Sequence, residues 1–516
     1  MTPPHSSSSD SSAIIGIDVG STSVRAIAFD VTGHRLAVGS RPTPLRRLET
    51  GGEYDPDALF AAAVDALSDV SSELNGRPVA GIAATSIGES CVLVDEAGRS
   101  LAPSIAWYDK RTLPQTQSIE RALGRERIFE ITGHAAEPIF TLTKLLWMRE
   151  HWPDALTGAR RVLMIADWIA FRLCGVMASE PMLASRTLYF DIRDRCWSGE
   201  LLALAGLNDR LPAPLKPSGT ALGPLRSEVL SQTGLAGKPV VGVGGHDHIV
   251  GAMVAGLLGE GLVVDSAGTA EGLMTAAPSP LMDPDTIRRG YVQGAIETDR
   301  RFSYVVGGIF SSGGAMEWLR SVLGDPSQQG LIAEASKIPP GSHGVVFLPH
   351  LVNSPPPEPD PSARGAFVGI TPTVTPAALY RAVLEGLALQ SRMLLDGMCS
   401  LTGVSPVNHI RLIGGVTRNY LFVSIKANAF GRPVGAIDEP ETTALGAALL
   451  AGVAAGIYPT FDAAVGGLRL KERIVEPDSD SRFYDELRTT VFSSLHERLR
   501  PINERLDRLF ALRQSS

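Results

Sequence analysis

The sequence has few cysteines, few aromatic residues and no surplus of positive charge. Its four cysteines are far apart and form no CxxC pair, so neither a disulfide framework nor a zinc ribbon is expected. They are predicted to be small buried apolar residues of a reducing compartment. No run of about 18 apolar residues is free of charge or glycine, which excludes a membrane-spanning helix. With 47 basic and 55 acidic residues the net charge is −8, which argues against nucleic acid as a binding partner.

What is present is ordinary globular composition, with 44% apolar and 20% charged residues. The 516 residues predict roughly two to four domains. Residues 1–12 lack the basic and apolar regions of a secretory signal and are expected to be a disordered serine-rich tail. We therefore expect a cytoplasmic protein that handles small molecules.

Strands alternate with helices along the chain, which predicts an α/β fold. Apolar patterns and turn residues place the elements. The predicted strands are Ala13–Asp18, Val24–Phe29, Val79–Ala84, Cys91–Val94, Pro239–Val243, Leu262–Asp265 and His409–Ile413. The predicted helices are Pro56–Leu74, Ile249–Leu257, Leu379–Leu395, Thr442–Ala454 and Ser481–Leu512. The proline-rich segment Pro355–Pro361 is predicted to be a stiff exposed loop.

Two segments resemble each other. IGIDVGSTSVRAIA near the start and LVVDSAGTAEGLMT in the middle both run apolar strand, aspartate, small-residue turn and strand. This weak duplication predicts two related α/β lobes. The link between them is expected near Ala255–Glu260.

The first of these turns has the chemistry of an anion site. Small residues at Gly20, Ser21, Thr22 and Ser23 would leave backbone amides and hydroxyls open to phosphate oxygens. Asp18, at the strand end, is placed to hold Mg²⁺ through water. The alternative is an ordinary hairpin turn. No GxxxxGK[ST] motif is present, so the site is not a P-loop.

Later small-residue turns extend this interpretation to a whole nucleotide. Gly268 and Thr269 form the matching turn of the second repeat, and two such turns favour phosphate binding. Gly414 and Gly415 follow a strand and would leave room for a flat group such as adenine, with Asn419 nearby and Gly313 in a similar stretch. Each glycine pair alone is equally compatible with close packing.

Asp247 is the candidate catalytic carboxylate. It follows a strand and precedes a helix, where a carboxylate could accept the proton of a hydroxyl that attacks a γ-phosphate. The alternatives are a helix N-cap and a metal site formed by His246 and His248.

A sugar-facing set is predicted from polar and aromatic residues near strand ends. Trp107 offers a stacking face, whereas Asp109, Arg111 and Glu89 offer partners for hydroxyls. A surface salt-bridged turn is the alternative for the Trp107–Arg111 segment.

The order of these motifs resembles the FGGY carbohydrate kinases of the sugar kinase, Hsp70 and actin superfamily, from about Ile14 to Thr460. IGIDVGSTSVRAIAFD is similar to the first phosphate motif, and PIFTLTKLLWMREH and GAFVGITPTVTPAALYRAVLEG nearly fit the two family signatures. RLIGGVTRNYLFVSIKANAFGRPV and ETTALGAALLAGVAAGIYP are similar to its adenosine segment and the helix after it. By this match Asp18 corresponds to the metal-linked aspartate, Thr22 to a phosphate-contacting threonine and Asp247 to the catalytic base.

The resemblance implies phosphorylation of a terminal hydroxyl with ATP and Mg²⁺, by two ribonuclease-H-like, actin-like ATPase lobes with a cleft between them. These lobes would be residues 13–256 on the sugar side and 257–470 on the nucleotide side, with a helical segment at 471–516. Trp107, Asp109, Arg111, Glu89 and His246 would hold a sugar or polyol. A homodimer rests on family analogy.

Departures from the family limit the choice of substrate. Xylulose kinases usually carry Gln-Met-His-Gly where this chain has Ser86–Ser90. Glu89 falls where glycerol kinases have an acid, but the arginine usual before it is Gly88. A ketopentose such as xylulose or ribulose is the leading expectation, with glycerol- or erythritol-type polyols and gluconate as alternatives. The rivals of another class are a nucleotide-binding switch and a sugar-binding regulator without turnover.

Overall fold

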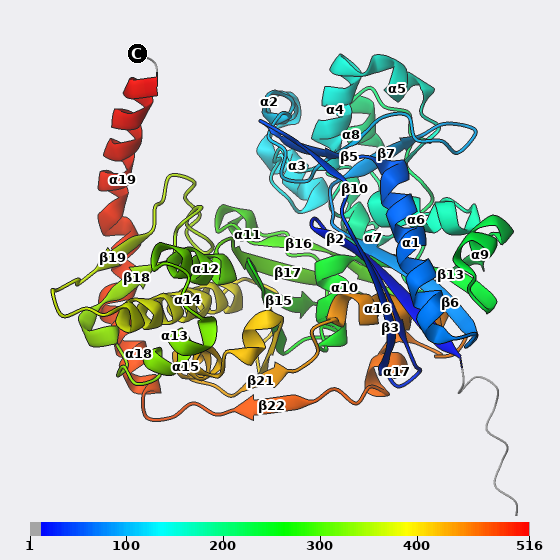
Figure 1. Ribbon diagram of the computed structural model, residues 1–516. Helices are drawn as coiled ribbons and strands as arrows, with labels where there is room; N and C mark the ends of the chain where they lie inside the picture. Colours follow the sequence, from blue (N-terminus) through cyan, green and yellow to red (C-terminus); the bar gives the residue numbers. More distant parts are fainter. Residues whose placement is uncertain (1–11, 515–516) are drawn as a thin grey trace, which may run out of the picture.

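The structure, a computed structural model, describes residues 12–514 and has two lobes, each built on one mixed β-sheet (Figure 1). The expected tail lies outside the described residues except for residue 12. The α/β class and the two-lobed architecture expected from the sequence are confirmed. Within residues 12–514 no helix is both long and apolar enough to cross a membrane.

The N-terminal lobe is built on a six-stranded sheet of order β12-β13-β6-β1-β2-β3. Its strands are β1 Ala13–Val19, β2 Ser23–Phe29, β3 Arg35–Pro42, β6 Val79–Ser86, β12 Ala221–Pro224 and β13 Gly237–His246. The C-terminal lobe is built on a seven-stranded sheet of order β16-β17-β15-β14-β20-β21-β22. Its strands are β14 Leu262–Ala267, β15 Glu271–Ala277, β16 Val292–Glu297, β17 Arg301–Ile309, β20 His409–Ile413, β21 Val434–Ile437 and β22 Glu472–Val475.

The two sheets repeat one topology. In the first, β1, β2 and β3 are antiparallel neighbours, and β6 and β13 follow on the other side of β1 in parallel. In the second, β14, β15 and β17 are antiparallel, and β20 and β21 follow in parallel. The same order and directions confirm the duplication predicted from the two similar sequence segments.

Helices and short sheets surround these cores. The helices of the N-terminal half are α1 Pro56–Leu74, α2 Leu113–Leu123, α3 Arg125–Thr132, α4 Thr141–His151, α5 Pro153–Gly158, α6 Ile165–Cys174, α7 Pro181–Ala184, α8 Gly199–Leu204, α9 Ser227–Thr233 and α10 Asp247–Val254. Those of the C-terminal half are α11 Asp285–Arg288, α12 Ser312–Val322, α13 Gln328–Ala335, α14 Pro376–Cys399, α15 Tyr420–Phe430, α16 Thr442–Ala454, α17 Phe461–Gly466, α18 Ser481–Leu487 and α19 Ser493–Gln514. The short strands are β4 Leu45–Leu48, β5 Gly51–Tyr54 and β8 Ser104–Ile105 in one sheet, β7 Cys91–Val94 with β9 Arg161–Met164, β10 Phe190–Asp191 with β11 Cys196–Trp197, and β18 Val346–Leu348 with β19 Ala366–Val368.

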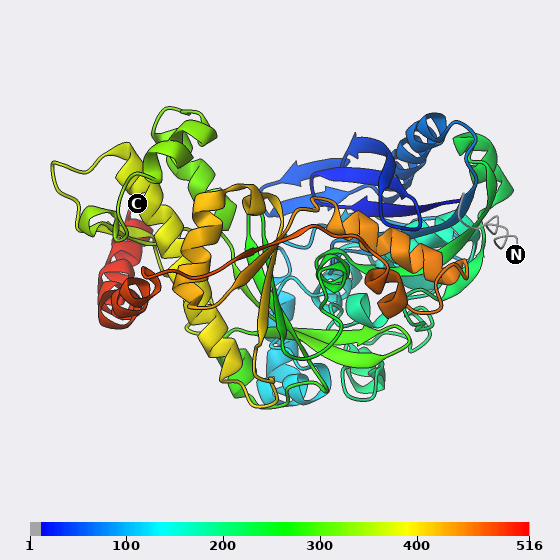
Figure 2. The ribbon, with the colours of Figure 1, turned by 90° about the horizontal axis from the view of Figure 1, so that it is seen from below.

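The lobes are joined by two helices that each cover the sheet of the other half. Helix α16 comes from the C-terminal half but packs on β1, β6 and β13, beneath the blue strands in Figure 2. Contact is close because Gly16 faces it, and a Cβ at Gly16 would overlap the carbonyl oxygen of Ala444. Helix α10 in turn shares an apolar cluster with Val264, Met274 and Ile413 of the C-terminal sheet. The core is therefore continuous between the lobes.

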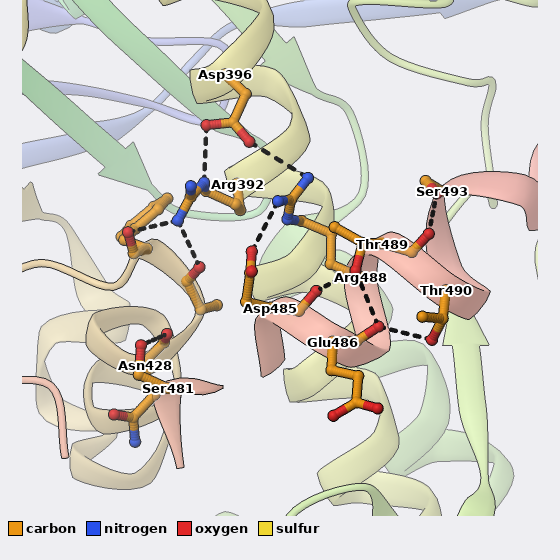
Figure 3. A network of polar contacts seen from close by, with 12 residues as sticks. Arg392, Asp396, Asn428, Ser481, Asp485, Glu486, Arg488, Thr489, Thr490 and Ser493 are labelled. Atoms are coloured by element: carbon orange, nitrogen blue, oxygen red, sulfur yellow. Dashed lines mark hydrogen bonds and ion pairs between the residues drawn. The ribbon is translucent and has the colours of Figure 1, made fainter. Parts of the chain in front are cut away.

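The predicted helical region Ser481–Leu512 is divided into α18, a short π-helix over Arg488–Phe492, and α19. Tyr484 and Phe492 are buried in the C-terminal core. Arg488 lies 3.5 Å from the Asp396 carboxylate, which also accepts a hydrogen bond of 2.7 Å from Arg392 (Figure 3). The first part of this segment is thus fastened to α14 by charge as well as by apolar packing.

Two sequence predictions were wrong in detail. Of the cysteines only Cys91 is fully buried, whereas Cys196 and Cys399 are exposed because they lie on a two-residue strand and at the end of α14. The proline-rich segment is not wholly exposed either. Pro355 and Pro356 are buried, since this loop turns back against the C-terminal lobe and lines a small cavity with His350 and His496.

Candidate active site

The parallel strands of the N-terminal sheet bring three acids to one edge. Asp18 on β1 pairs in register with Thr85 on β6, and Thr85 pairs with Gly245 on β13. Glu89 follows β6 and Asp247 follows β13. Because parallel strands end at the same edge, a ligand site is expected there.

Asp247 is the first residue of α10, directly after β13, and only 9% of its surface is exposed. Its Oδ1 accepts a 2.7 Å hydrogen bond from the backbone amide of His248 and lies 3.2 Å from His246 Nδ1. His246, not Asp247, holds the N-cap position. Burial, with a smaller contribution from Glu89, raises the pKa of Asp247, while His248 lowers it. A desolvated carboxylate of this kind is suited to accepting a proton.

Asp18 is close enough to Asp247 for their charges to interact, and it lacks a full set of partners. Its buried Oδ1 has no hydrogen-bond partner among the described residues. Burial and the charge of Asp247 raise the pKa of Asp18 to about 7, although Arg25 lowers it. Arg25 is itself paired with Glu441. An unpartnered carboxylate beside a second acid fits a divalent cation, and Mg²⁺ prefers one or two carboxylates with water and phosphate oxygens.

The alternative of a histidine metal site is not supported. The rings of His246 and His248 lie 6.1 Å apart and are tilted by 40°. Across residues 12–514, no three His, Cys, Asp or Glu side chains are grouped so that they could hold a metal ion.

The first small-residue turn joins β1 and β2 as predicted. The Gly20 amide donates to the Ser23 carbonyl at 3.0 Å, and Ser21 and Thr22 are exposed at its tip. A Cβ on Gly20 would meet nothing closer than Ser23 O at 3.4 Å. The backbone is therefore open to a ligand.

The second turn has the same form between β14 and β15. The Gly268 amide donates to Ala270 O at 2.8 Å, and Gly268 and Thr269 are exposed. The amides of Gly313 and Gly314 donate to Gly268 O and Thr269 O at 2.9 and 3.0 Å. Gly313 thus supports this turn from α12, and its own amide is already engaged.

A buried charge cluster lies beneath the second turn. Lys426 Nζ on α15 is 2.5 Å from Asp265 Oδ2 and 2.7 Å from Glu271 Oε1. Ser312 Oγ donates to Glu271 Oε2 at 2.7 Å. The cluster links both strands of the turn to the helices behind it. The sequence analysis missed it because these groups are 161 and 155 residues apart.

The predicted adenine segment serves two purposes. Gly414 has a φ of 95°, and a Cβ there would overlap the carbonyl of Ala267, so this glycine allows close packing. Gly415 meets nothing within 4 Å and leaves open space. Asn419 caps α15, because its Oδ1 accepts a 3.1 Å hydrogen bond from Phe422 N.

Glu89, which the sequence predicts to face a sugar, is held in an unusual backbone conformation. Its φ is 61°, in the left-handed region, and it is 5% exposed. Its carbonyl accepts hydrogen bonds from Thr141 Oγ1 at 3.0 Å and from the buried Lys144 Nζ at 3.1 Å. Strained residues of this kind gather at functional sites.

Arg186 is the main residue that the sequence analysis missed here. Its Nε and one Nη each lie 2.5 Å from Glu89 Oε1, and its guanidinium stacks over Phe140 at 5.0 Å. It stands 97 residues after Glu89, in an apolar stretch without motif character. Tyr304 of the C-terminal sheet interacts with the same guanidinium.

The Trp107–Arg111 segment is built differently from the expectation. Arg111 binds both oxygens of Asp109 and also Glu53, at 2.7 to 3.0 Å. The Asp109 carboxylate also accepts a hydrogen bond from Gly52 N at 2.9 Å. Both charges are therefore engaged inside the protein, and Trp107 is half-buried beside them. The segment is a buried ion-pair network and not a surface turn.

Comparison with known proteins finds relatives that span nearly the whole chain. Residues 13–254 match the N-terminal domain of the FGGY family of carbohydrate kinases, and residues 263–455 match its C-terminal domain. The L-fuculokinase of Escherichia coli is 31% identical, covering 92% of this chain and 99% of that protein. A glycerol kinase of Bordetella parapertussis is 30% identical, covering 90% and 92%. The crystal structure of a xyloylose kinase from Brucella ovis has a TM-score of 0.86 and 26% identity, covering 95% and 100%.

Proposed function

The chain belongs to the FGGY family of carbohydrate kinases, and we propose that it transfers the γ-phosphate of ATP to a terminal hydroxyl of an uncharged ketose or polyol. The observation that carries the proposal is the placement of Asp247. This buried carboxylate of raised pKa lies at the β13–α10 junction, beside Asp18 and Glu89 and between the halves that carry the two open turns.

In the proposed reaction Asp247 accepts the proton of the substrate hydroxyl. The hydroxyl oxygen forms the new bond to the γ-phosphorus, and the bond to the bridging oxygen of ADP breaks. Phosphoryl transfer needs mainly positioning and neutralisation of charge. The Asp247 carboxylate is desolvated and forms no ion pair with an arginine among the described residues, and such a carboxylate is sufficient as the base.

The other predicted site residues take the supporting roles. The turns of Gly20–Ser23 and Gly268–Thr269 offer amides and hydroxyls to the phosphates, and Gly415 offers open backbone to the adenine. Asp18 would hold Mg²⁺, which when bound supplies positive charge to the phosphate oxygens. Asp109 and Arg111 act on the sugar site by fixing the β4–β5–β8 sheet and Trp107.

Among substrates, a ketopentose remains the leading proposal and a glycerol- or erythritol-type polyol the second. Relatives named for L-fuculose, glycerol and xylulose show how widely the family varies. Gluconate is the weakest of the three because the site already gathers Asp18, Glu89 and Asp247. The rival of another class is a nucleotide switch or a sugar-binding regulator without turnover. The presence of Asp247 as a catalytic base argues against both, because neither needs one.

A coupled ADP-release assay over ketopentoses, hexuloses, polyols and aldonates tests the proposal. One group of neutral acceptors should stimulate ADP release. Asp247→Asn should keep the fold and lower turnover about 10²- to 10⁴-fold, since the base is lost but not the shape. The matched control is Asp30→Asn. Asp30 lies in an exposed turn, where its Oδ1 accepts hydrogen bonds from the amides of Thr32 and His34. Normal turnover in Asp247→Asn, or no acceptor in the wild type, would refute the proposal.

A further inference from the structure

The surroundings of Glu89 are more specialised than a single acid at a strand end requires. Glu89 has a left-handed φ, and its carbonyl is held by two buried donors, Thr141 and Lys144. Such conformations persist only where the neighbouring structure over-determines them. What the conformation fixes is the direction of the Glu89 carboxylate.

Arg186 binds that carboxylate on one side only. Both of its contacts, from Nε and from Nη, are to Oε1 at 2.5 Å. No hydrogen bond to Oε2 forms among the described residues. A guanidinium has five N–H donors in a fixed planar fork. The pair therefore presents an acceptor oxygen and N–H donors side by side.

The local packing leaves little room for a side chain at Gly88, so the cation beside Glu89 is supplied by Arg186. A Cβ at Gly88 would lie 2.8 Å from the His246 ring and 3.2 Å from Arg186 Cγ. A side chain at position 88 would thus displace either the neighbour of the base or the arginine itself. Gly88, Arg186 and His246 are parts of one packed unit next to Asp247.

The charge balance of the unit favours an uncharged ligand. Burial lowers the pKa values of His246 and His134 well below the usual range, so neither adds positive charge at neutral pH. Arg186 then faces the acids Glu89 and Glu137, and Lys144 donates to backbone carbonyls. A second carboxylate, brought in by an aldonate, would meet net negative charge.

Tyr304 extends the unit into the other lobe. It lies on β17 and is fully buried, and its hydroxyl interacts with Arg186. It packs on its cross-strand partner Gly294, where any Cβ would overlap the Tyr304 ring. Arg186 consequently joins the sugar side of the N-terminal lobe to a strand of the C-terminal sheet.

From this juxtaposition we infer that Arg186 is a specificity-determining residue. Its guanidinium donates to one hydroxyl of the acceptor while Glu89 Oε2 accepts from the neighbouring hydroxyl. The ligand class is an uncharged polyhydroxylated acceptor with two adjacent hydroxyls besides the reacting one. The inference rests on the proposed function and deepens it.

The test uses the full-length chain and the best neutral acceptor from the ADP-release panel, together with its analogues that each lack one hydroxyl and the matching aldonate. The variants are Arg186→Gln, which removes the charge, and Arg186→Lys, which keeps it without the fork. The control is Arg195→Gln, because Arg195 is also largely buried and joins the lobes, but it donates to the carbonyls of Ile296 and Phe302.

Arg186→Gln should lower kcat/KM for the acceptor by about 10- to 100-fold, while KM for ATP stays within about twofold. The preference of the wild type for the acceptor over one deoxy analogue should shrink by the same factor. Arg186→Lys should restore part of it, and Arg195→Gln should leave the preference unchanged.

An equal loss of kcat/KM for acceptor and deoxy analogues in both Arg186 variants would mean a purely structural role and would overturn the inference. So would aldonate turnover by the wild type comparable to that of the neutral acceptor. If Arg186→Gln does not fold, the ratio measured with Arg186→Lys decides. A wild type that accepts no sugar refutes the proposed function instead, and the two failures are thereby distinguished.

Discussion

Replacing Lys426 with methionine tests how the second turn is held in place. The Lys426 side chain is completely buried and lies 2.5 Å from Asp265 and 2.7 Å from Glu271. Methionine has a similar length and no charge. The variant therefore leaves two carboxylates facing each other without their cation, directly beneath Gly268 and Thr269.

The size of the effect follows from the burial. Removing one partner of a buried ion pair costs about 3–5 kcal/mol, because the remaining charge is left unpaired. For a lobe of this size, 1 kcal/mol corresponds to roughly 2–4 °C in melting temperature. Lys426→Met should thus melt about 6–20 °C below the wild type at pH 8.

The loss should shrink on acidification. Burial and Glu271 raise the pKa of Asp265 to about 7, although Lys426 lowers it, so between about pH 4 and pH 7 the folded state holds a proton that the unfolded state has lost. Without Lys426 the pKa of Asp265 rises further. Protonation removes the repulsion that the variant exposes. We expect the difference in melting temperature from wild type to be smaller at pH 6 than at pH 8.

The assay is thermal unfolding at pH 6, 7 and 8, followed by circular dichroism. The matched variant combines Lys426→Met with Asp265→Asn and Glu271→Gln, which removes all the charges and should regain most of the stability. If Lys426→Met melts within 2–3 °C of the wild type at every pH, a deficit far below the roughly 6 °C minimum above, the cluster does not hold the turn and the reasoning is refuted.

Two further predictions concern stability alone. Burial raises the pKa of Asp167 to about 7 and that of Glu180 to about 8, so the folded state binds more protons than the unfolded state. The free energy of unfolding should therefore fall from about pH 4 to pH 8. A denaturation series in which the free energy of unfolding rises across this range would contradict the prediction. Gly16→Val should prevent α16 from packing, because its Cβ would overlap Ala444 O, and should abolish or strongly reduce the yield of folded protein. The control is Gly199→Ala, where a Cβ meets nothing within 4 Å, and equal yields of the two variants would count against close packing at Gly16.

Local signals in the sequence were enough to place many elements. Helices α1 and α16 and strand β20 have the predicted bounds, Pro56–Leu74, Thr442–Ala454 and His409–Ile413. In α1 the apolar spacing is reinforced by an N-cap, since Asp55 accepts from two amides and proline follows it. Where periodicity and cap residues agree, tertiary packing has little left to decide.

The candidate site was predictable only as far as its turns and its strand-end acids. The partners of those acids could not be read from the sequence, because Arg186 and Lys426 reach them from 97 and 161 residues away. Asp109 and Arg111 present the converse difficulty. The sequence shows two polar groups that suit a hydroxyl, but only the fold shows that they satisfy each other and Glu53.

The duplication places an aspartate at the same position in both lobes, but the two aspartates have different surroundings. Asp18 and Asp265 occupy equivalent places, each one residue before the end of the parallel register with the next strand. In the second lobe Lys426 lies against Asp265 and compensates its charge. Both aspartates keep one buried oxygen without a hydrogen-bond partner, but in the first lobe no ion pair of Asp18 forms among the described residues, and the charges that act on it are those of Asp247 and Arg25. The same residue at the same position is thus neutralised within the protein in one repeat, whereas in the other its charge is left for a ligand to compensate. This asymmetry is the physical reason why we propose Mg²⁺ at Asp18 and not at both turns.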